Sequence, residues 1–327
     1  MHIGYHASHE QFAPGKLIEL VKRAEKAGFT AGMCSDHFKP WNNRQSESGF
    51  AWSWLGAALQ GTSLPFGVVS APGQRYHPAI IAQAAATLAE MFPDRFWIAV
   101  GSGQLMNEAI TGDKWPTKKE RNERLLKCVR IIRALWEGKT VTYQGHVRVE
   151  EAKLYSLPER PPLLLGAALT PETAAWVGEW ADGLITVSAQ EEQLSEMIKA
   201  FHSGGGKGKP MYMQMKISYA LTEEEALKGA WEQWRSTILK SSVNTELRSP
   251  EVLDAAAEFV KPEDMRDYVH ISSDINKYVN WIDKYTGMGF ENIYAHNVNL
   301  DQQRFIDDFG KHVLPALQAS RAVGAGK

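Results

Sequence analysis

The stretch Arg95-Phe96-Trp97-Ile98-Ala99-Val100, followed by Gly101-Ser102-Gly103, decides the fold class of this chain. Five consecutive apolar residues between an arginine and a glycine turn are typical of a strand that is buried on both faces. Strands of this kind belong to parallel sheets, and functional loops follow their carboxyl ends. The stretch therefore predicts a parallel strand of an α/β domain, with a candidate site directly after it.

Seven further segments read as strands, and segments with helical periodicity separate most of them. Leu17, Leu20, Val21 and Ala24, for example, recur at helical spacing up to the stop at Gly28. The eight predicted strands are Ile3–Tyr5, Ala31–Ser35, Ser63–Val69, Arg95–Val100, Leu163–Leu165, Gly183–Val187, Met211–Ala220 and Asn292–His296. This alternation predicts a single (β/α)8 TIM barrel over residues 1–327. We expect two insertions: a hairpin over Thr140–Val149 and a polar helical segment near residues 231–267.

Composition narrows the functional classes. The 327 residues are 44% hydrophobic and carry a net charge of −2, without the concentrated basic surface that nucleic acid requires. No apolar run approaches the ~20 residues that span a bilayer, and the N-terminus does not resemble a signal peptide. The two cysteines predict a reduced, cytoplasmic setting, and no metal-ligand spacing occurs. We therefore expect a small-molecule substrate, without nucleic acid, membrane or metal. We also expect a homodimer.

The second strand ends on Asp36 and His37, with Trp41 four residues after the histidine. At the carboxyl end of a barrel strand, an acceptor and a titratable imidazole indicate an acid–base site, and the indole is placed to form a wall of the same pocket. The alternative is a loop aspartate that caps a helix, beside a half-buried histidine.

Three other strand ends carry candidate residues. The fourth strand is followed by Gly101, Gly103, Gln104 and Asn107, where the glycines allow a flat ligand to approach and Asn107 either binds it or caps a helix. After the fifth strand, small residues and a helix N-terminus suit a phosphate, with an ordinary turn as the alternative. The residues of this phosphate loop are Gly166, Ala167, Ala168, Leu169 and Thr170. Ser188, at the next strand end, is a weaker contributor.

Several of these motifs occur together in one order. They are Ser8-His9-Glu10-Gln11-Phe12-Ala13-Pro14, Cys34-Ser35-Asp36-His37 with Pro40-Trp41, Arg75-Tyr76-His77-Pro78 with Ile81-Ala82-Gln83, Val100-Gly101-Ser102-Gly103 with Asn107-Glu108 and Thr111-Gly112, and Ala181-Asp182-Gly183. From Gly4 to Leu314 the chain resembles the luciferase-like flavin oxidoreductases. Within them it is most similar to the glucose-6-phosphate dehydrogenases that use a deazaflavin, coenzyme F420.

This resemblance implies a (β/α)8 barrel and specific roles. It implies that His37 takes the substrate hydroxyl proton during hydride transfer and that Trp41 braces the reacting centre. It also implies that Asp36, Asn107, a cis peptide bond between Val68 and Val69, and the backbone of 166–168 hold the cofactor.

The chain departs from the sugar-phosphate branch at three positions. Gln104 stands where that branch has a glutamate, and Gln190 and Asp267 stand where it places lysines on the phosphate. These changes argue against glucose 6-phosphate and predict FMN as the cofactor, with a separate flavin reductase as a possible partner. The predicted activity is hydride transfer or oxygen activation on a small organic substrate. One alternative is a deazaflavin-dependent dehydrogenase of an alcohol or sugar, and the other is a non-catalytic flavin-binding protein.

Overall fold

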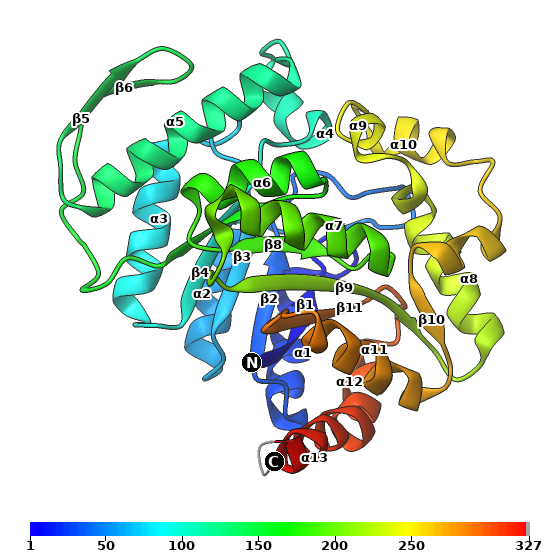
Figure 1. The fold of residues 1–327 in the computed structure, drawn as a ribbon. Coiled ribbons are helices and arrows are strands. Elements are labelled where there is room, and N and C mark those ends of the chain that lie inside the picture. Colours follow the sequence, from blue (N-terminus) through cyan, green and yellow to red (C-terminus); the bar gives the residue numbers. More distant parts are fainter. Residues whose placement is uncertain (325–327) are drawn as a thin grey trace.

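Eight parallel strands close into a barrel in the computed structural model, which describes residues 1–324. In ring order they are β1 (His2–Ala7), β2 (Ala31–Ser35), β3 (Phe66–Ser70), β4 (Phe96–Val100), β7 (Leu163–Ala167), β8 (Leu184–Val187), β9 (Met211–Tyr219) and β11 (Asn292–Asn297). The pairings of β9 with both β8 and β11 close the ring. The predicted (β/α)8 barrel is therefore confirmed, and all eight predicted strands lie in it (Figure 1).

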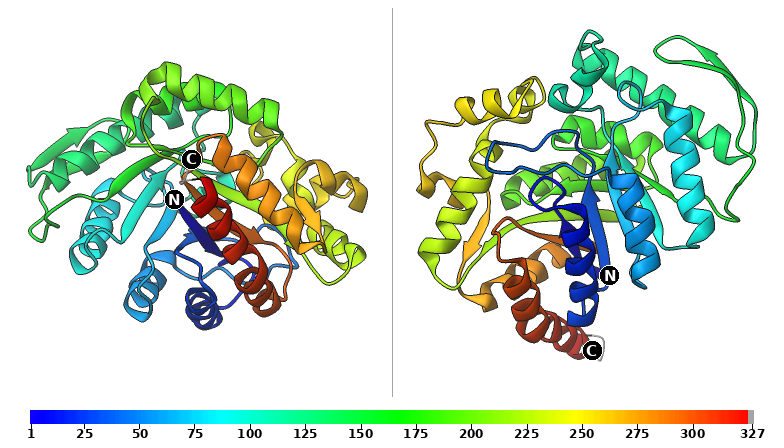
Figure 2. Two further views of the ribbon diagram at one scale, coloured as in Figure 1. Left: turned by 60° about the horizontal axis from the view of Figure 1, so that its bottom comes forward. Right: turned by 180° about the vertical axis from the view of Figure 1, so that it is seen from behind.

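Helices surround the barrel and cover its outer face (Figure 2). They are α1 (Pro14–Ala27), α2 (Ala51–Gly61), α3 (Pro78–Met91), α5 (Lys118–Trp136), α6 (Pro171–Trp180), α7 (Glu191–Phe201), α8 (Glu223–Trp234), α11 (Ile275–Gly287), α12 (Gln302–Asp308) and α13 (Leu314–Gly324). In α1 the periodic residues Leu17, Leu20, Val21 and Ala24 are buried, and Gly28 ends the helix at a φ of 100°. None of the described helices is long and apolar enough to cross a membrane.

Large aromatic side chains fill the N-terminal end of the barrel. Trp97 lies against Tyr212 and Tyr294, and its indole N–H donates to the Tyr294 hydroxyl at 3.0 Å. Gly4 and Gly67 provide the space, since a Cβ on Gly67 would lie 1.8 Å from the Trp97 ring. Because this end is packed solid, polar side chains and ligands have room only at the carboxyl ends of the strands.

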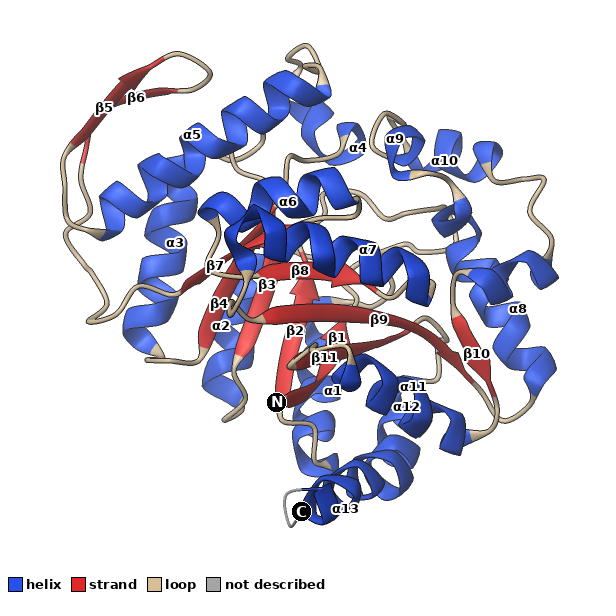
Figure 3. Cartoon of the chain, in the orientation of Figure 1, coloured by secondary structure: helices blue, strands red, loops and turns tan. Residues whose placement is uncertain are grey.

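The structure adds elements outside the ring. Figure 3 shows the hairpin of β5 (Val141–Gln144) and β6 (Arg148–Ala152) projecting beyond α5. Within 231–267, where we expected a helical insertion, residues up to 234 belong to α8. The remainder forms η3 (Arg235–Ile238), α9 (Ser241–Asn244), α10 (Pro250–Ala256) and η4 (Pro262–Asp267). Strand β10 (His270–Ser272), absent from the sequence prediction, pairs with the outer part of β9.

Candidate active site

The first two strands place a carboxylate against an imidazole at the rim of the barrel. Glu10 lies just beyond β1 and His37 just beyond β2, and Nδ1 of His37 is 2.6 Å from Oε1 of Glu10. The other carboxylate oxygen accepts hydrogen bonds from the hydroxyls of Ser8 at 3.0 Å and Ser35 at 2.6 Å. Sequence analysis assigned no role to Glu10, so this pairing is a contribution of the structure.

The surroundings keep Glu10 ionised. Burial alone would raise the pKa of this carboxyl group, but the charge and contact of His37 and the Ser35 hydroxyl outweigh it and bring the pKa well below its usual range. The carboxylate holds Nδ1 of His37, and Nε2 has no hydrogen-bond partner among the described residues. The His37 side chain remains 19% exposed. A proton can therefore be taken up at Nε2 with a fixed negative charge behind the ring.

The Trp41 indole lies beside this imidazole. The two ring centroids are 4.6 Å apart and the rings are nearly perpendicular, at 80°. The loop between them is held from two sides, because Ser48 donates to the His37 carbonyl and the Trp41 amide donates to Gln45. The structure thus brings the rings of His37 and Trp41 into contact, and their shared role in a substrate pocket stays a prediction.

Asp36 has a structural environment that the sequence did not indicate. Its buried carboxylate accepts hydrogen bonds from Ser70 at 2.7 Å and from the Tyr76 hydroxyl at 2.9 Å. The Arg75 guanidinium lies 3.5 Å from the same carboxylate and 3.6 Å from Glu108. In this structure Asp36 therefore ties the ends of β2 and β3 together.

Asn107 also bonds to the loop that follows His37. Its amide oxygen accepts from the backbone N–H groups of Phe38 at 2.9 Å and Lys39 at 3.2 Å. Its amide nitrogen donates to Gln104 at 3.3 Å, where Gln104 precedes the short helix α4 (Leu105–Glu108). Gln104 and Asn107 thus lie in contact with each other and with the loop that carries the imidazole.

The residues of the predicted phosphate loop, 166–170, have different environments in the structure. The Thr170 hydroxyl accepts from the Thr173 amide and caps α6, which is the ordinary-turn alternative. Gly166 faces outward, because a Cβ there would lie 2.4 Å from Val177 in α6. Ala168 is buried, whereas Leu169 is 52% exposed. These contacts show a well-formed βα turn, and its use for a phosphate stays a prediction.

The ends of β3, β4 and β7 fit a flat ring. Val69 and Ala167 are half-buried at the inner surface of the barrel, and a Cβ added at Gly101 would meet only Ala167, at 3.7 Å. These strands follow β2, which carries His37, around the ring. A ring cofactor held here by Val69, Gly101 and Ala167 would have the space that small residues leave. The peptide bond between Val68 and Val69 is trans, so the implied cis bond is not found.

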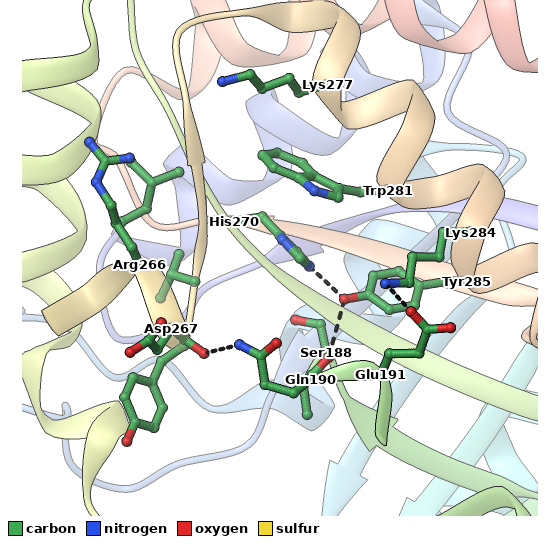
Figure 4. A pocket seen from close by; sticks show the side chains of 14 residues that line it. Ser188, Gln190, Glu191, Arg266, Asp267, His270, Lys277, Trp281, Lys284 and Tyr285 are labelled. Carbon is green, nitrogen blue, oxygen red and sulfur yellow. Dashed lines mark hydrogen bonds and ion pairs between the residues drawn. The ribbon is translucent and has the colours of Figure 1, made fainter. Parts of the chain in front are cut away.

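Ser188 is buried, and its hydroxyl accepts from the backbone N–H of Lys216 at 2.9 Å. It also lines a cavity of about 400 Å³ between the end of β8, β10 and α11 (Figure 4). The cavity contains Trp281 stacked on His270, with their ring centroids 4.5 Å apart. His270 in turn lies 2.6 Å from the hydroxyl of Tyr285.

Gln190 and Asp267 meet at the edge of the same cavity. The Gln190 side-chain amide donates to the Asp267 carbonyl oxygen at 3.1 Å, as Figure 4 shows. This contact connects the loop after β8 to the end of η4. Two of the three positions at which the sequence departs from the sugar-phosphate branch are therefore bonded to each other.

A cluster of buried histidines lies deeper in the barrel, beneath Trp234. His6 of β1 stacks on His296 of β11, with centroids 3.9 Å apart, and the Trp234 ring meets His296 edge-on at 4.4 Å. Burial lowers the pKa of His6 to about 4 and that of His296 well below its usual value. Gln214 contacts Nδ1 of His296 at 2.6 Å. These neutral rings form a floor that sequence analysis did not identify.

The end of α8, which covers these histidines, is held in place by hydrogen bonds to Gln233. The Gln11 side chain donates to the Gln233 side chain at 3.0 Å, and Asn42 and Gln45 both donate to the Gln233 carbonyl. The end of α8 is thereby bonded to the loops that follow β1 and β2. It forms a roof over the same rim that carries Glu10 and His37.

The fold and this rim define a class of protein: a (β/α)8-barrel enzyme with a carboxylate-supported histidine beside space for a flat ring. The model of the luciferase-like monooxygenase family matches residues 1–292, and the chain belongs to that family. It is an oxidoreductase of this family with a cofactor of flavin type.

Known relatives match nearly the full length of the chain. It is 34% identical over 340 residues to the F420-dependent glucose-6-phosphate dehydrogenase of Nakamurella multipartita, covering 99% of this chain and 98% of the relative. A solved F420-dependent secondary alcohol dehydrogenase, in complex with an F420-acetone adduct, is 30% identical. It covers 97% of this chain and 98% of its own, with a TM-score of 0.91. A tetrahydromethanopterin reductase from Methanopyrus kandleri, 20% identical with a TM-score of 0.77, shows the fold alone over 97% of this chain and 99% of its own.

Proposed function

We propose that this protein is a deazaflavin-dependent dehydrogenase that oxidises a small secondary alcohol to a ketone. The observation that carries the proposal is the contact between Glu10 and His37 at the rim of the barrel. The named relatives support coenzyme F420 over FMN, which reverses the order in which the sequence ranked them. The alternative given there, a deazaflavin-dependent dehydrogenase, thus becomes the main proposal.

The reaction removes a hydride from carbon and a proton from oxygen. When bound, the deazaflavin supplies an acceptor for the hydride and its two electrons. His37 accepts the hydroxyl proton at Nε2, and the ionised Glu10 stabilises the imidazolium that results. The C=O bond forms as the C–H and O–H bonds break, so the products are a ketone, the reduced cofactor and a proton on His37.

Trp41 and the roof determine what surrounds the reacting carbon. The indole stands edge-on to the imidazole, and the end of α8 is bonded over the rim through Gln233. Bulky apolar walls exclude water from the proton transfer and strengthen the electrostatic effect of Glu10. They also favour a small alcohol.

Two contacts support a substrate without a sugar phosphate. Gln190 donates to the Asp267 backbone, so neither position offers a cation to a phosphate dianion. Gln104 bonds Asn107 and carries no titratable proton, which leaves His37 as the proton carrier of this rim. Both features distinguish the chain from the branch that oxidises glucose 6-phosphate.

The test titrates the purified protein with coenzyme F420 and with FMN, and then adds a series of secondary alcohols. We expect tight binding of F420 and loss of its visible absorbance when an alcohol is present. Binding of FMN alone, with oxygen consumption after reduction, would instead restore the monooxygenase prediction. Binding of either cofactor without turnover of any alcohol, ketone or aldehyde would favour the flavin-binding protein.

A further inference from the structure

One half-buried cation on the inner face of the barrel has no anionic partner among the described residues. Lys216 lies on β9, where its register partner on β11 is His296. Its ammonium group makes one hydrogen bond, to the Thr237 hydroxyl at 3.4 Å, and no carboxylate of residues 1–324 lies within 4.0 Å of it. Burial lowers the pKa of Lys216 to about 8, so the group is still mainly protonated at neutral pH.

Lys216 lies on β9 close to the rim of the barrel. Side chains two residues apart on a strand share a face, so Lys216 stands one step closer to the carboxyl end of β9 than Gln214, which contacts His296. Thr237 belongs to η3, which directly follows the roof residues Gln233 and Trp234. Lys216 therefore lies beneath the end of α8, beside the stacked rings of His6 and His296.

The groups packed around Lys216 leave its charge uncompensated. His296 and His270 are neutral at pH 7, because burial lowers both pKa values, that of His270 to about 4. Ser188 and Thr237 contribute hydroxyls only. A desolvated ammonium without a counter-charge is costly, and a ligand anion removes that cost.

We propose that Lys216 is a specificity-determining residue that binds a carboxylate of the substrate, so that the natural alcohol is a hydroxy acid. This inference rests on the proposed dehydrogenase function and deepens it. A single ammonium matches a monoanion, and a carboxylate accepts its N–H donors through two oxygens. A phosphate dianion would need a second cation, and the ammonium of Lys216 has none beside it within 1–324.

A matched pair of substrates tests the proposal. 3-Hydroxybutyrate and 2-butanol share a secondary hydroxyl and a chain of four carbons, and differ in the terminal carboxylate. We expect kcat/KM for the acid to exceed that for the alcohol by at least ~10-fold, equivalent to ~1.4 kcal/mol. Lys216→Met should abolish the preference by raising KM for the acid, while the rate with 2-butanol changes less than about twofold.

Lys277→Met is the matched control, because Lys277 lines the outer cavity of Figure 4 and makes no ion pair within the described residues. It should retain the wild-type preference. Loss of the preference in this variant, or equal loss with both substrates in Lys216→Met, would overturn the proposal. Inorganic phosphate should not inhibit; inhibition that Lys216→Met relieves would assign a phosphate instead.

Binding of butyrate separates the two hypotheses, since butyrate cannot be oxidised at a hydroxyl. Calorimetry should show that butyrate binds the wild-type holoprotein and binds Lys216→Met at least ~10-fold more weakly. If no alcohol is oxidised but this difference is found, the anion site stands and the dehydrogenase proposal fails. If butyrate binds both proteins equally, the role of Lys216 is refuted.

Discussion

Nδ1 of His37 and Oε1 of Glu10 are 2.6 Å apart, although the two residues lie in loops that follow different strands of the barrel. Through this contact, two side chains take part in one proton transfer: one accepts the proton and the other stabilises the resulting charge. Glu10 supplies a permanent negative charge because Ser8 and Ser35 hold its second oxygen. His37 supplies the titratable nitrogen at the pocket.

Replacing His37 removes the proton carrier and leaves the ring space at β3, β4 and β7 intact. We expect His37→Ala to lower kcat by ~10²–10⁴-fold, the range for the loss of one positioned acid–base group. Cofactor affinity, measured by fluorescence titration, should change little. Unchanged turnover with a measured substrate would remove His37 from the mechanism.

Replacing Glu10 tests the charge behind the imidazole. Glu10→Gln keeps the size of the side chain but removes the charge, so kcat should fall by roughly 10²-fold, because the imidazolium formed during proton transfer loses its anionic neighbour. Glu10→Asp should recover part of the activity. A Glu10→Gln variant with wild-type kcat would contradict the assigned role.

The space that Gly101 and Ala167 leave for the cofactor ring can be tested by adding bulk and charge there. Ala167→Glu adds bulk and negative charge beside Gly101, so cofactor affinity should fall at least ~10-fold, or ~1.4 kcal/mol. Leu163→Glu, exposed at the opposite end of β7, is the control and should bind the cofactor normally. Wild-type affinity in Ala167→Glu, measured by calorimetry, would place the ring elsewhere.

The histidine floor predicts a loss of stability in acid. His6 is neutral in the fold because burial lowers its pKa from 6.5 to about 4, whereas the unfolded chain binds a proton below pH 6.5. The unfolded state therefore binds more protons, and the free energy of unfolding falls as pH drops from 6.5 toward 4. The difference of 2.5 pKa units amounts to about 3 kcal/mol. Urea unfolding at several pH values measures it.

His6→Gln is the matched variant for that experiment. Glutamine does not titrate, so the decline of unfolding free energy between pH 6.5 and 4 should become shallower. The exposed His202, replaced in the same way, should leave the slope unchanged. Identical slopes for wild type and His6→Gln would show that His6 is not held neutral by the fold.

The barrel strands could be predicted from sequence because each is an apolar run that ends at turn residues or polar tips. Strand β10 could not, since three residues with a histidine at the first position give no periodic signal. The residues Asp36 and Asn107 were found by position alone. Their partners depend on how β2, β3 and α4 come together, which local sequence does not specify.

The role of Glu10 was missed for a related reason. Its contact with His37 requires the parallel register of β1 and β2, in which His6 lies beside Met33 and Ala7 beside Cys34. A shift of one residue would turn these side chains to opposite faces. Lys216 was missed because it lies within the apolar pattern of Met211–Ala220, where a single charge reads as an outward-facing residue. The fold itself makes it face inward.

The hydrogen bonds that meet at Gln233 hold the roof, the end of α8, as one unit. Gln11, Asn42 and Gln45 reach one residue from two different loops, so each holds the same segment in place. Substitutions at these three positions should therefore combine non-additively, the second costing less than the first. A change of substrate range through the roof would then require that Gln11, Asn42, Gln45 and Gln233 are exchanged together. A single substitution would already loosen the end of α8.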